Sequence, residues 1–230
     1  MQQFTQKLSS GQINILSTPL PSLDPGSVLV QNYYSLVSAG TEGSTVQAAR
    51  KSYIGKAKER PQQVKQVLDT LKSQGPVQTY RAVMKKLDAH SPLGYSCVGE
   101  VIGVGEDVMD FRVGDLVACG GTLYAYHAAA VAVPRKLAVN LPFASGHNLS
   151  LEKHLQGAAY NTLGAIAMQG VRQADLRLGE TCAVIGLGLL GQLACLLLRA
   201  SAVRIVGVDV SPDMVELAQK NCVDMALICD

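Results

Sequence analysis

Three glycines with the spacing G-x-G-x-x-G are the residues whose pattern points most directly to chemistry. The six-residue run that contains them reads Gly186-Leu187-Gly188-Leu189-Leu190-Gly191. In such a run the first glycine permits a tight turn, the second lets the backbone approach a pyrophosphate, and the third allows a helix to pack closely on a strand. Free N–H groups at the start of that helix would attract the phosphates. The pattern therefore predicts that this run binds a dinucleotide.

The segments on both sides of the glycines supply the context that this interpretation needs. "TCAVI" before them is typical of a buried strand, "QLACLLLRAS" after them of a helix, and "VRIVGVD" of a second strand. The second strand ends in Asp209, whose carboxylate could accept hydrogen bonds from a ribose and would repel the 2′-phosphate of NADP. The sequence therefore predicts NAD as the cofactor, with NADP disfavoured. A simpler role for Asp209, as an acid near the start of the helix at "SPDM", stays open.

The stretch from Thr181 to Leu198 has no charged residue and is long enough to be a candidate membrane span. It separates, however, into a strand and a helix joined by the glycine turn. Strands that are buried on both faces of a parallel sheet also read as continuous apolar runs. We therefore expect no membrane span, and the absence of a signal-peptide pattern at the N-terminus favours a cytoplasmic protein.

Composition favours a globular protein, with 48% hydrophobic residues, 17% charged residues and a net charge of +2 over 230 residues. No overall field argues for nucleic acid. The six cysteines form no CxxC pair and lie mostly in apolar stretches, where cysteine behaves as a small hydrophobic residue. We expect reduced core cysteines and no disulfide framework or zinc knuckle.

Residues 1–150 are predicted to form a β domain with a helical insertion at about 46–90. Strand patterns such as "SVLVQNYYS" precede the insertion, "YSCVGEVIGVG" follows it, and helical patterns cover 61–73 and "VQTYRAVMKKLD". Ten Lys and Arg and three Asp and Glu lie between Val46 and His90, an excess of seven positive charges. This excess is typical of a solvated helical surface, or of a basic rim that attracts an anionic substrate. RNA binding has little support, because only Tyr53 and Tyr80 could stack on bases there.

Residues 151–230 are predicted to form one half of a doubly wound parallel sheet. After helical segments between Leu151 and Val171, broken near 161–164, the predicted elements are strand 181–186, helix 190–200, strand 204–209, helix 212–221 and strand 225–229. A complete dinucleotide-binding sheet has two such halves. We therefore expect either that the 230 residues are the N-terminal part of a longer enzyme or that another segment supplies the missing half of the sheet. We expect these residues alone to bind cofactor poorly and to be inactive.

The segment "LGYSCVGEVIGVGEDVMDFRVGDLVA", with the spacing G-x-x-V-x-x-F-x-V-G-D-x-V from Gly105 to Val117, resembles the medium-chain dehydrogenase/reductase superfamily. "VIGLGLLG" and "VGVD" fit the same family. The resemblance implies an α/β fold class, in which a GroES-like β domain is followed by a Rossmann sheet, here a partial one. We expect Val108, Phe111 and Val113 to pack inward, around a turn at Gly114-Asp115.

Three other stretches, "SLVSAGTE", "IGKAKERPQQVKQVLDTLKSQG" and "PLGYSCVGEV", resemble the N-terminal part of two-domain bacterial oxidoreductases. In those proteins a Gfo/Idh/MocA-type region follows the Rossmann domain. The resemblance implies a small-molecule substrate derived from a sugar.

The family's zinc ligands are replaced in this chain. Zinc alcohol dehydrogenases carry Cys-Gly-Thr-Asp where the chain has 39–42, "AGTE", and Gly-His-Glu where it has 94–96, "GYS". The four-cysteine lobe is absent, and the later ligand region, "GAAYNTLGA", has no Cys or Asp. Without thiolate or imidazole ligands a tetrahedral zinc site is not expected. The resemblance therefore implies a zinc-independent enzyme without a metal.

Without zinc, another group must donate a proton or hydrogen bond to the substrate oxygen. Tyr95 replaces the zinc-binding histidine and is the candidate acid, which Ser96 could assist as a relay or by holding a water. Glu42 is the other titratable candidate, and Thr162 is implied to line the nicotinamide site. Tyr95 could instead be a packing residue with its hydroxyl in water.

The leading hypothesis is a zinc-independent NAD-dependent oxidoreductase, or its N-terminal piece, that transfers hydride between nicotinamide and an alcohol or carbonyl compound. The substrate would be a sugar-derived alcohol or ketone, or a conjugated carbonyl as in quinone reductases. The alternative is a non-catalytic dinucleotide-binding regulatory or scaffold module. A homo-oligomer is left open.

Overall fold

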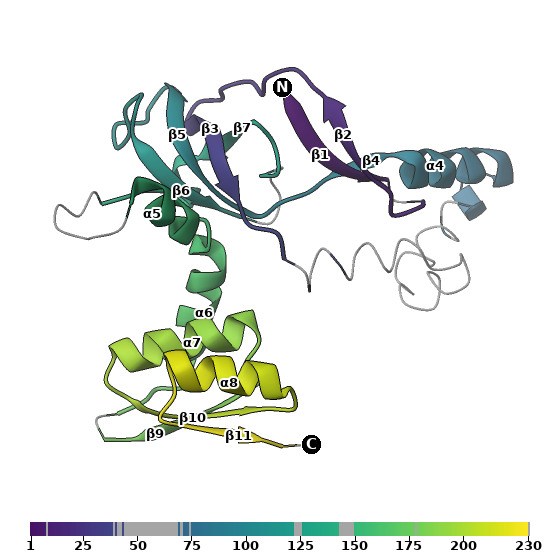
Figure 1. The fold of residues 1–230 in the computed structure, drawn as a ribbon. Helices are drawn as coiled ribbons and strands as arrows, with labels where there is room; N and C mark the ends of the chain where they lie inside the picture. Colours follow the sequence, from purple (N-terminus) through teal and green to yellow (C-terminus); the bar gives the residue numbers. More distant parts are fainter. Residues whose placement is uncertain are drawn as a thin grey trace. The chain divides into compact units, whose positions relative to one another are not determined.

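The computed structural model divides into two compact units, Met1–Ala159 and Tyr160–Asp230. It describes residues 1–7, 9–38, 40, 43, 69, 71–73, 75–121, 126–142, 150–177 and 179–229 (Figure 1). The division falls after helix α5 (Leu151–Ala158), which therefore belongs to the first unit, whereas the sequence analysis placed the boundary before it.

The first unit is built on a five-stranded antiparallel sheet with the strand order β7-β3-β5-β6-β8. Its strands are β3 (Ser27–Ser35), β5 (Ser96–Val104), β6 (Leu116–Gly120), β7 (Ala130–Pro134) and β8 (Ala138–Asn140), and the 3₁₀ helix η1 (Arg135–Leu137) joins the last two. The central strands are rich in β-branched residues, which fit a pleated, buried surface. Their valines form the core, with Val28, Val30 and Val101 fully buried.

A smaller antiparallel sheet, with the order β2-β1-β4, completes the β structure of the first unit. Its strands are β1 (Gln2–Lys7), β2 (Ile13–Ser17) and β4 (His90–Pro92). The second helix predicted for the insertion is confirmed as α4 (Pro76–Asp88), whose proline stands at its first position, where the missing N–H costs nothing. The predicted helix at 61–73 lies mostly outside the described residues.

One packing prediction in the first unit is wrong. Val108 and Phe111 are each 7% exposed and belong to the core, as expected, but Val113 is 67% exposed. That expectation came with the family resemblance. The chain turns here, with Arg112 N–H bonded to the Asp115 carboxylate at 2.7 Å and Gly114 at φ +94°, and this turn leaves the Val113 side chain exposed.

The second unit contains a three-stranded parallel sheet with the order β11-β10-β9. Its elements are α6 (Asn161–Gln173), β9 (Thr181–Ile185), α7 (Leu189–Ala200), β10 (Arg204–Asp209), α8 (Pro212–Asn221) and β11 (Met225–Ile228). Helices α7 and α8 lie on the same face of the sheet (Figure 1). Leu187, Leu198 and Ile205 are almost fully buried between these layers. The strand–helix–strand–helix–strand order predicted from the sequence is confirmed.

The apolar stretch from Thr181 to Leu198 is therefore a strand, a turn and most of a twelve-residue helix. In the part of the chain that the structure describes, no helix has the length and apolarity needed to cross a membrane.

Candidate cofactor-binding site

The glycine-rich turn connects the carboxyl end of β9 to the start of α7. Gly186 has φ +92°, a left-handed conformation that favours glycine, and its N–H donates to Val208 O at 2.8 Å. Gly188 is the N-cap residue of α7, with φ −65° and ψ −171°. The turn is thus tied to β10 on one side and leads directly into a helix N-terminus on the other.

The second and third glycines meet different surroundings. A Cβ atom built on Gly191 would lie 1.9 Å from Gly186 O, so only glycine allows α7 to pack this closely on the turn. A Cβ atom on Gly188 would have nothing within 4 Å. The backbone at Gly188 therefore faces open space, which fits the close approach of a phosphate group.

Asp209, the last residue of β10, is held between two turns. One carboxylate oxygen accepts a hydrogen bond from Leu187 N–H at 2.6 Å, and the other accepts from Ser211 N–H at 2.8 Å. The bond from Ser211, and next that from Leu187, lower the pKa of the Asp209 carboxyl below its usual value. Ser211 is the N-cap residue of α8, so Asp209 is bonded at the start of that helix as well as at the glycine-rich turn.

Gln192 is a residue of this site that sequence reasoning missed. Its side-chain amide donates to Leu187 O at 3.1 Å and to Met214 O at 3.3 Å. A signal was present in the sequence, because Gln192 carries the one amide or charged side chain between Leu189 and Leu198. A polar side chain within an apolar helix needs hydrogen-bond partners.

Tyr95, the candidate acid, lies in the bend between β4 and β5, directly after Gly94. Gly94 has φ +103°, and a Cβ atom there would lie 2.4 Å from His127 N, so close backbone packing requires glycine. The backbone carbonyl of Tyr95 accepts from Gly121 N–H at 3.0 Å, and its hydroxyl oxygen is buried. The burial contradicts only the placement of this hydroxyl in water, and a packing role for Tyr95 stays open beside its role as the acid.

The other predicted residues are distributed over the chain. Ser96 is fully buried, and its hydroxyl donates to Ala159 O at 2.7 Å, which fastens the end of α5 to β5. Thr162 lies in the first turn of α6, in the second unit, and its hydroxyl donates to Asn161 Oδ1 at 3.2 Å. Tyr95 belongs to the first unit, and Glu42 lies outside the described residues. The proposed catalytic roles therefore stay predictions.

Residues that could bind a metal have other contacts. Cys97 and Cys119 are buried opposite each other on β5 and β6, and their interaction, together with burial, raises the pKa of the Cys97 thiol. The His127 ring nitrogen lies 2.8 Å from the Ser35 hydroxyl. Among the described residues, no three or more His, Cys, Asp or Glu side chains gather in a way that could hold a metal ion.

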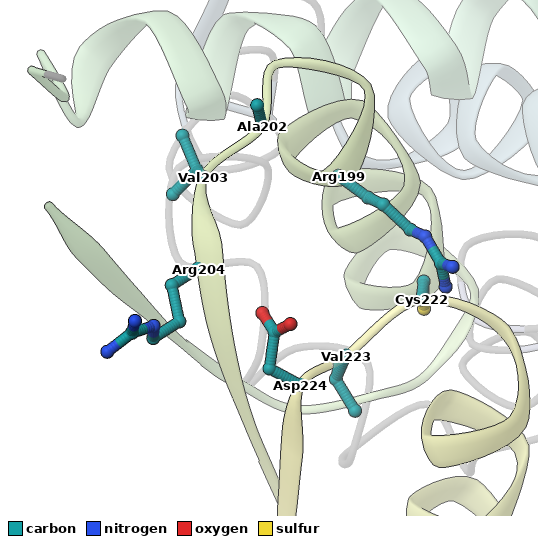
Figure 2. A pocket seen from close by; sticks show the side chains of 7 residues that line it. All are labelled: Arg199, Ala202, Val203, Arg204, Cys222, Val223 and Asp224. Carbon is teal, nitrogen blue, oxygen red and sulfur yellow. The ribbon is translucent and has the colours of Figure 1, made fainter. Parts of the chain in front are cut away.

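A cavity of about 400 Å³ lies at the amino ends of the parallel strands, where β10 and β11 begin (Figure 2). The glycine-rich turn lies at the carboxyl end of β9. It is lined by Arg199, Ala202, Val203, Arg204, Cys222, Val223 and Asp224. Arg199 donates to Asn221 O at 2.7 Å, and Asp224 accepts from Ile205 N–H at 2.7 Å. Ligands of doubly wound sheets bind at the carboxyl ends of the strands, so this cavity is not the candidate cofactor site.

Similar sequences are oxidoreductases. The chain is 36% identical over 141 residues to D-guloside 3-dehydrogenase of Escherichia coli. The aligned region covers 59% of this chain and 36% of that protein. It is 36% identical over 134 residues to a quinone oxidoreductase of Pseudomonas aeruginosa. Here the aligned region covers 57% of this chain and 39% of that protein. The chain thus spans well under half of the length of these curated relatives. No family model matches the chain.

Solved structures agree with the fold. Galactitol-1-phosphate dehydrogenase of Escherichia coli superimposes with a TM-score of 0.71 and 15% identity, over 98% of this chain and 60% of that one. Escherichia coli quinone oxidoreductase, solved with NADPH, gives a TM-score of 0.68 and 16% identity. This superposition covers 99% of this chain and 58% of that one. The chain has the α/β fold of medium-chain dehydrogenases and reductases. The GroES-like and partial Rossmann architecture predicted from the sequence is confirmed at this level.

Proposed function

We propose that the protein is an NAD-dependent oxidoreductase, or the N-terminal part of one, that transfers hydride between nicotinamide and an alcohol or carbonyl substrate. The observation that carries the proposal is a strand–turn–helix–strand motif. It consists of β9, the glycine-rich turn, α7 and β10, and it ends in Asp209. The curated relatives are named as dehydrogenases and reductases, which supports an enzyme over a regulatory or scaffold module.

The residues of the turn fit the dinucleotide. The pyrophosphate would lie at the N-terminus of α7, beside Gly188, where open space and free N–H groups meet the positive end of a helix dipole. Asp209 retains further lone pairs for ribose hydroxyls, since each carboxylate oxygen offers about two acceptor sites. The cofactor supplies the hydride chemistry, and the protein residues bind and orient it.

NAD is proposed as the cofactor because of the charge at Asp209. Its lowered pKa keeps the carboxylate ionised near neutral pH, where it would repel a 2′-phosphate. Two structural neighbours were solved with NADPH, but at 15% and 16% identity they establish the fold alone. The choice between the two cofactors rests on this chain's own carboxylate.

For the substrate we propose a sugar-derived alcohol or ketone, in line with the name of the D-guloside 3-dehydrogenase relative. Catalysis would not use zinc, because residues 94–96, "GYS", stand where the zinc enzymes have their histidine motif. Tyr95 would then donate the hydrogen bond or proton to the substrate oxygen. The stretches around the insertion support membership of the subgroup that carries a Gfo/Idh/MocA-type region.

Calorimetric titration with NAD and NADP, followed by an assay of nicotinamide reduction with sugars and sugar alcohols on the full-length gene product, tests the proposal. We expect NAD to bind more tightly, and at least one sugar-derived alcohol to reduce it. If neither dinucleotide binds, the proposal fails. If the dinucleotide binds but no alcohol reduces NAD and no ketone or quinone oxidises NADH, the regulatory module is favoured.

A further inference from the structure

We propose that Gln192 is a positioning residue that aims the backbone N–H of Gly188 at the cofactor's pyrophosphate. The inference rests on the proposed function, because it assigns a role within the same dinucleotide site. It starts from a single hydrogen bond, from the Gln192 side-chain amide to Leu187 O at 3.1 Å.

Both backbone polar groups of Leu187 are held by side chains from different elements. Its N–H donates to the Asp209 carboxylate at 2.6 Å, and its C=O accepts from Gln192 on α7. The Leu187 side chain is fully buried in the core beneath the turn. Neither the backbone nor the side chain of this residue is therefore free to rotate.

Peptide geometry links Leu187 O to Gly188 N–H. The two groups belong to one planar peptide unit, and in a trans peptide they point in opposite directions. Among the described residues the structure has no cis peptide bond. By drawing Leu187 O toward the helix, Gln192 turns the N–H of Gly188 to the other side. The space beside Gly188 is open, since a Cβ atom there would meet nothing within 4 Å.

The Gln192 amide is itself fixed by a second element. Its nitrogen also donates to Met214 O in the first turn of α8, at 3.3 Å, and its oxygen accepts from the Cys222 thiol at 3.5 Å. Because the amide nitrogen has two hydrogens, both bonds can form together. Helix α8 thus fixes the Gln192 side chain, which in turn is bonded to the glycine-rich turn.

The test compares Gln192→Met with Gln219→Met in the full-length gene product and uses ADP-ribose as the probe. Methionine keeps the length and volume of the side chain but removes its hydrogen bonds. Gln219 lies exposed on α8, so its substitution is the matched control. We expect Gln192→Met to raise the dissociation constant for ADP-ribose about tenfold and to speed hydrogen exchange of the Gly188 amide in the ADP-ribose complex, whereas Gln219→Met should match wild type in both measurements.

Gln192→Glu provides a second test that does not depend on the methionine variant folding. An ionised glutamate would repel Leu187 O, whereas a protonated one could donate to it. We expect ADP-ribose binding by this variant to recover, relative to wild type, as the pH falls from about 7.5 to about 5, where a glutamate beside carbonyl oxygens becomes protonated.

The outcomes separate the two proposals. If the wild-type protein binds neither ADP-ribose nor NAD, the proposed function fails. If wild type binds, but Gln192→Met binds equally well with unchanged exchange at Gly188, the role of Gln192 is overturned. A Gln192→Glu variant whose relative affinity does not change with pH also overturns it.

Discussion

The carboxylate of Asp209 accepts a hydrogen bond from the backbone N–H of Leu187 at 2.6 Å, which joins the end of β10 to the glycine-rich turn. The acid expected from the sequence to face a ribose therefore also fixes the turn that would face the pyrophosphate. Asparagine keeps the shape of the side chain and removes its charge, and its amide oxygen can still accept one of the two hydrogen bonds.

Asp209→Asn is expected to weaken the preference for NAD. The neutral amide no longer repels a 2′-phosphate, and its NH₂ group cannot accept from Leu187 or Ser211. We expect NAD binding to weaken by roughly tenfold, the cost of a charge-assisted hydrogen bond, and NADP binding to weaken less. Calorimetry with both cofactors measures the ratio. Tighter NADP than NAD binding by the wild-type protein would contradict the assignment of Asp209.

The two later glycines of the turn should respond differently to alanine. Gly191→Ala places a methyl group 1.9 Å from Gly186 O, a backbone atom, so α7 must move away. We expect this variant to lose several degrees of melting temperature, since a buried clash typically costs about 1–3 kcal/mol. Thermal unfolding followed by circular dichroism measures the loss.

Gly188→Ala is the matched variant. Its methyl group would meet none of the described residues within 4 Å, and φ −65° suits any residue, so the melting temperature should stay near that of wild type. The methyl group would, however, occupy the space proposed for the pyrophosphate, and dinucleotide affinity should fall. Unchanged affinity in a stable Gly188→Ala protein would argue against a pyrophosphate at this point.

Buried thiols give a prediction about pH. Burial, followed by the neighbouring Cys222, raises the pKa of the Cys195 thiol to about 12. In the unfolded chain this thiol would lose its proton at about pH 8.5, so stability should fall as the pH rises from there toward 12. The slope of unfolding free energy against pH should be shallower in Cys195→Ser.

Alkylation offers a direct check of the same burial. Cys229 is exposed, whereas Cys97, Cys119, Cys195 and Cys222 are buried. Iodoacetamide at pH 8 should label Cys229 before the four buried cysteines in the native protein, because the reagent cannot reach buried thiols. Equal labelling of Cys195 and Cys229 under native conditions would contradict the described core.

The elements of the second unit could be predicted because each carries a strong local signal. "TCAVI" and "RIVGVD" are compact apolar runs, and the glycines between strand and helix restrict the chain to a known turn. Val113 could not be placed in this way. Its inward packing was expected from the family resemblance, which does not show how the bond between Arg112 N–H and the Asp115 carboxylate orients the side chains of this turn.

The site was predicted in part, for a related reason. Glycines are visible in a sequence because the backbone itself requires them. The hydrogen-bond partners of Leu187 depend instead on the folded conformation of the turn, and on which side chains from other elements reach its N–H and C=O groups. Asp209 on β10 accepts from the N–H, and Gln192 on α7 donates to the C=O. A polar residue within an apolar helix indicates that some partner exists, but not which one.

The last prediction concerns Tyr95 as the acid of a zinc-free reaction. Tyr95→Phe keeps the aromatic ring and leaves the backbone bond from Gly121 in place. It removes only the hydroxyl. If this hydroxyl donates to the substrate oxygen, turnover by the full-length gene product should fall by roughly 10²- to 10⁴-fold, the usual contribution of a general acid. Cofactor affinity should change little, since the dinucleotide is held by other residues.

Tyr33→Phe is the control for this experiment. Tyr33 lies on β3, is 43% exposed, and donates its hydroxyl to Glu100, so its loss removes a phenol hydroxyl from the same unit at a surface position. Turnover should then stay at the wild-type level, because an exposed hydrogen bond contributes little to stability. If Tyr95→Phe also turns over normally, the acid lies elsewhere, and Glu42 becomes the residue to replace. A loss of turnover in Tyr95→Phe alone, with an unchanged dissociation constant for NAD, would show that the Tyr95 phenol polarises the substrate oxygen. In the metal-dependent enzymes zinc has this role.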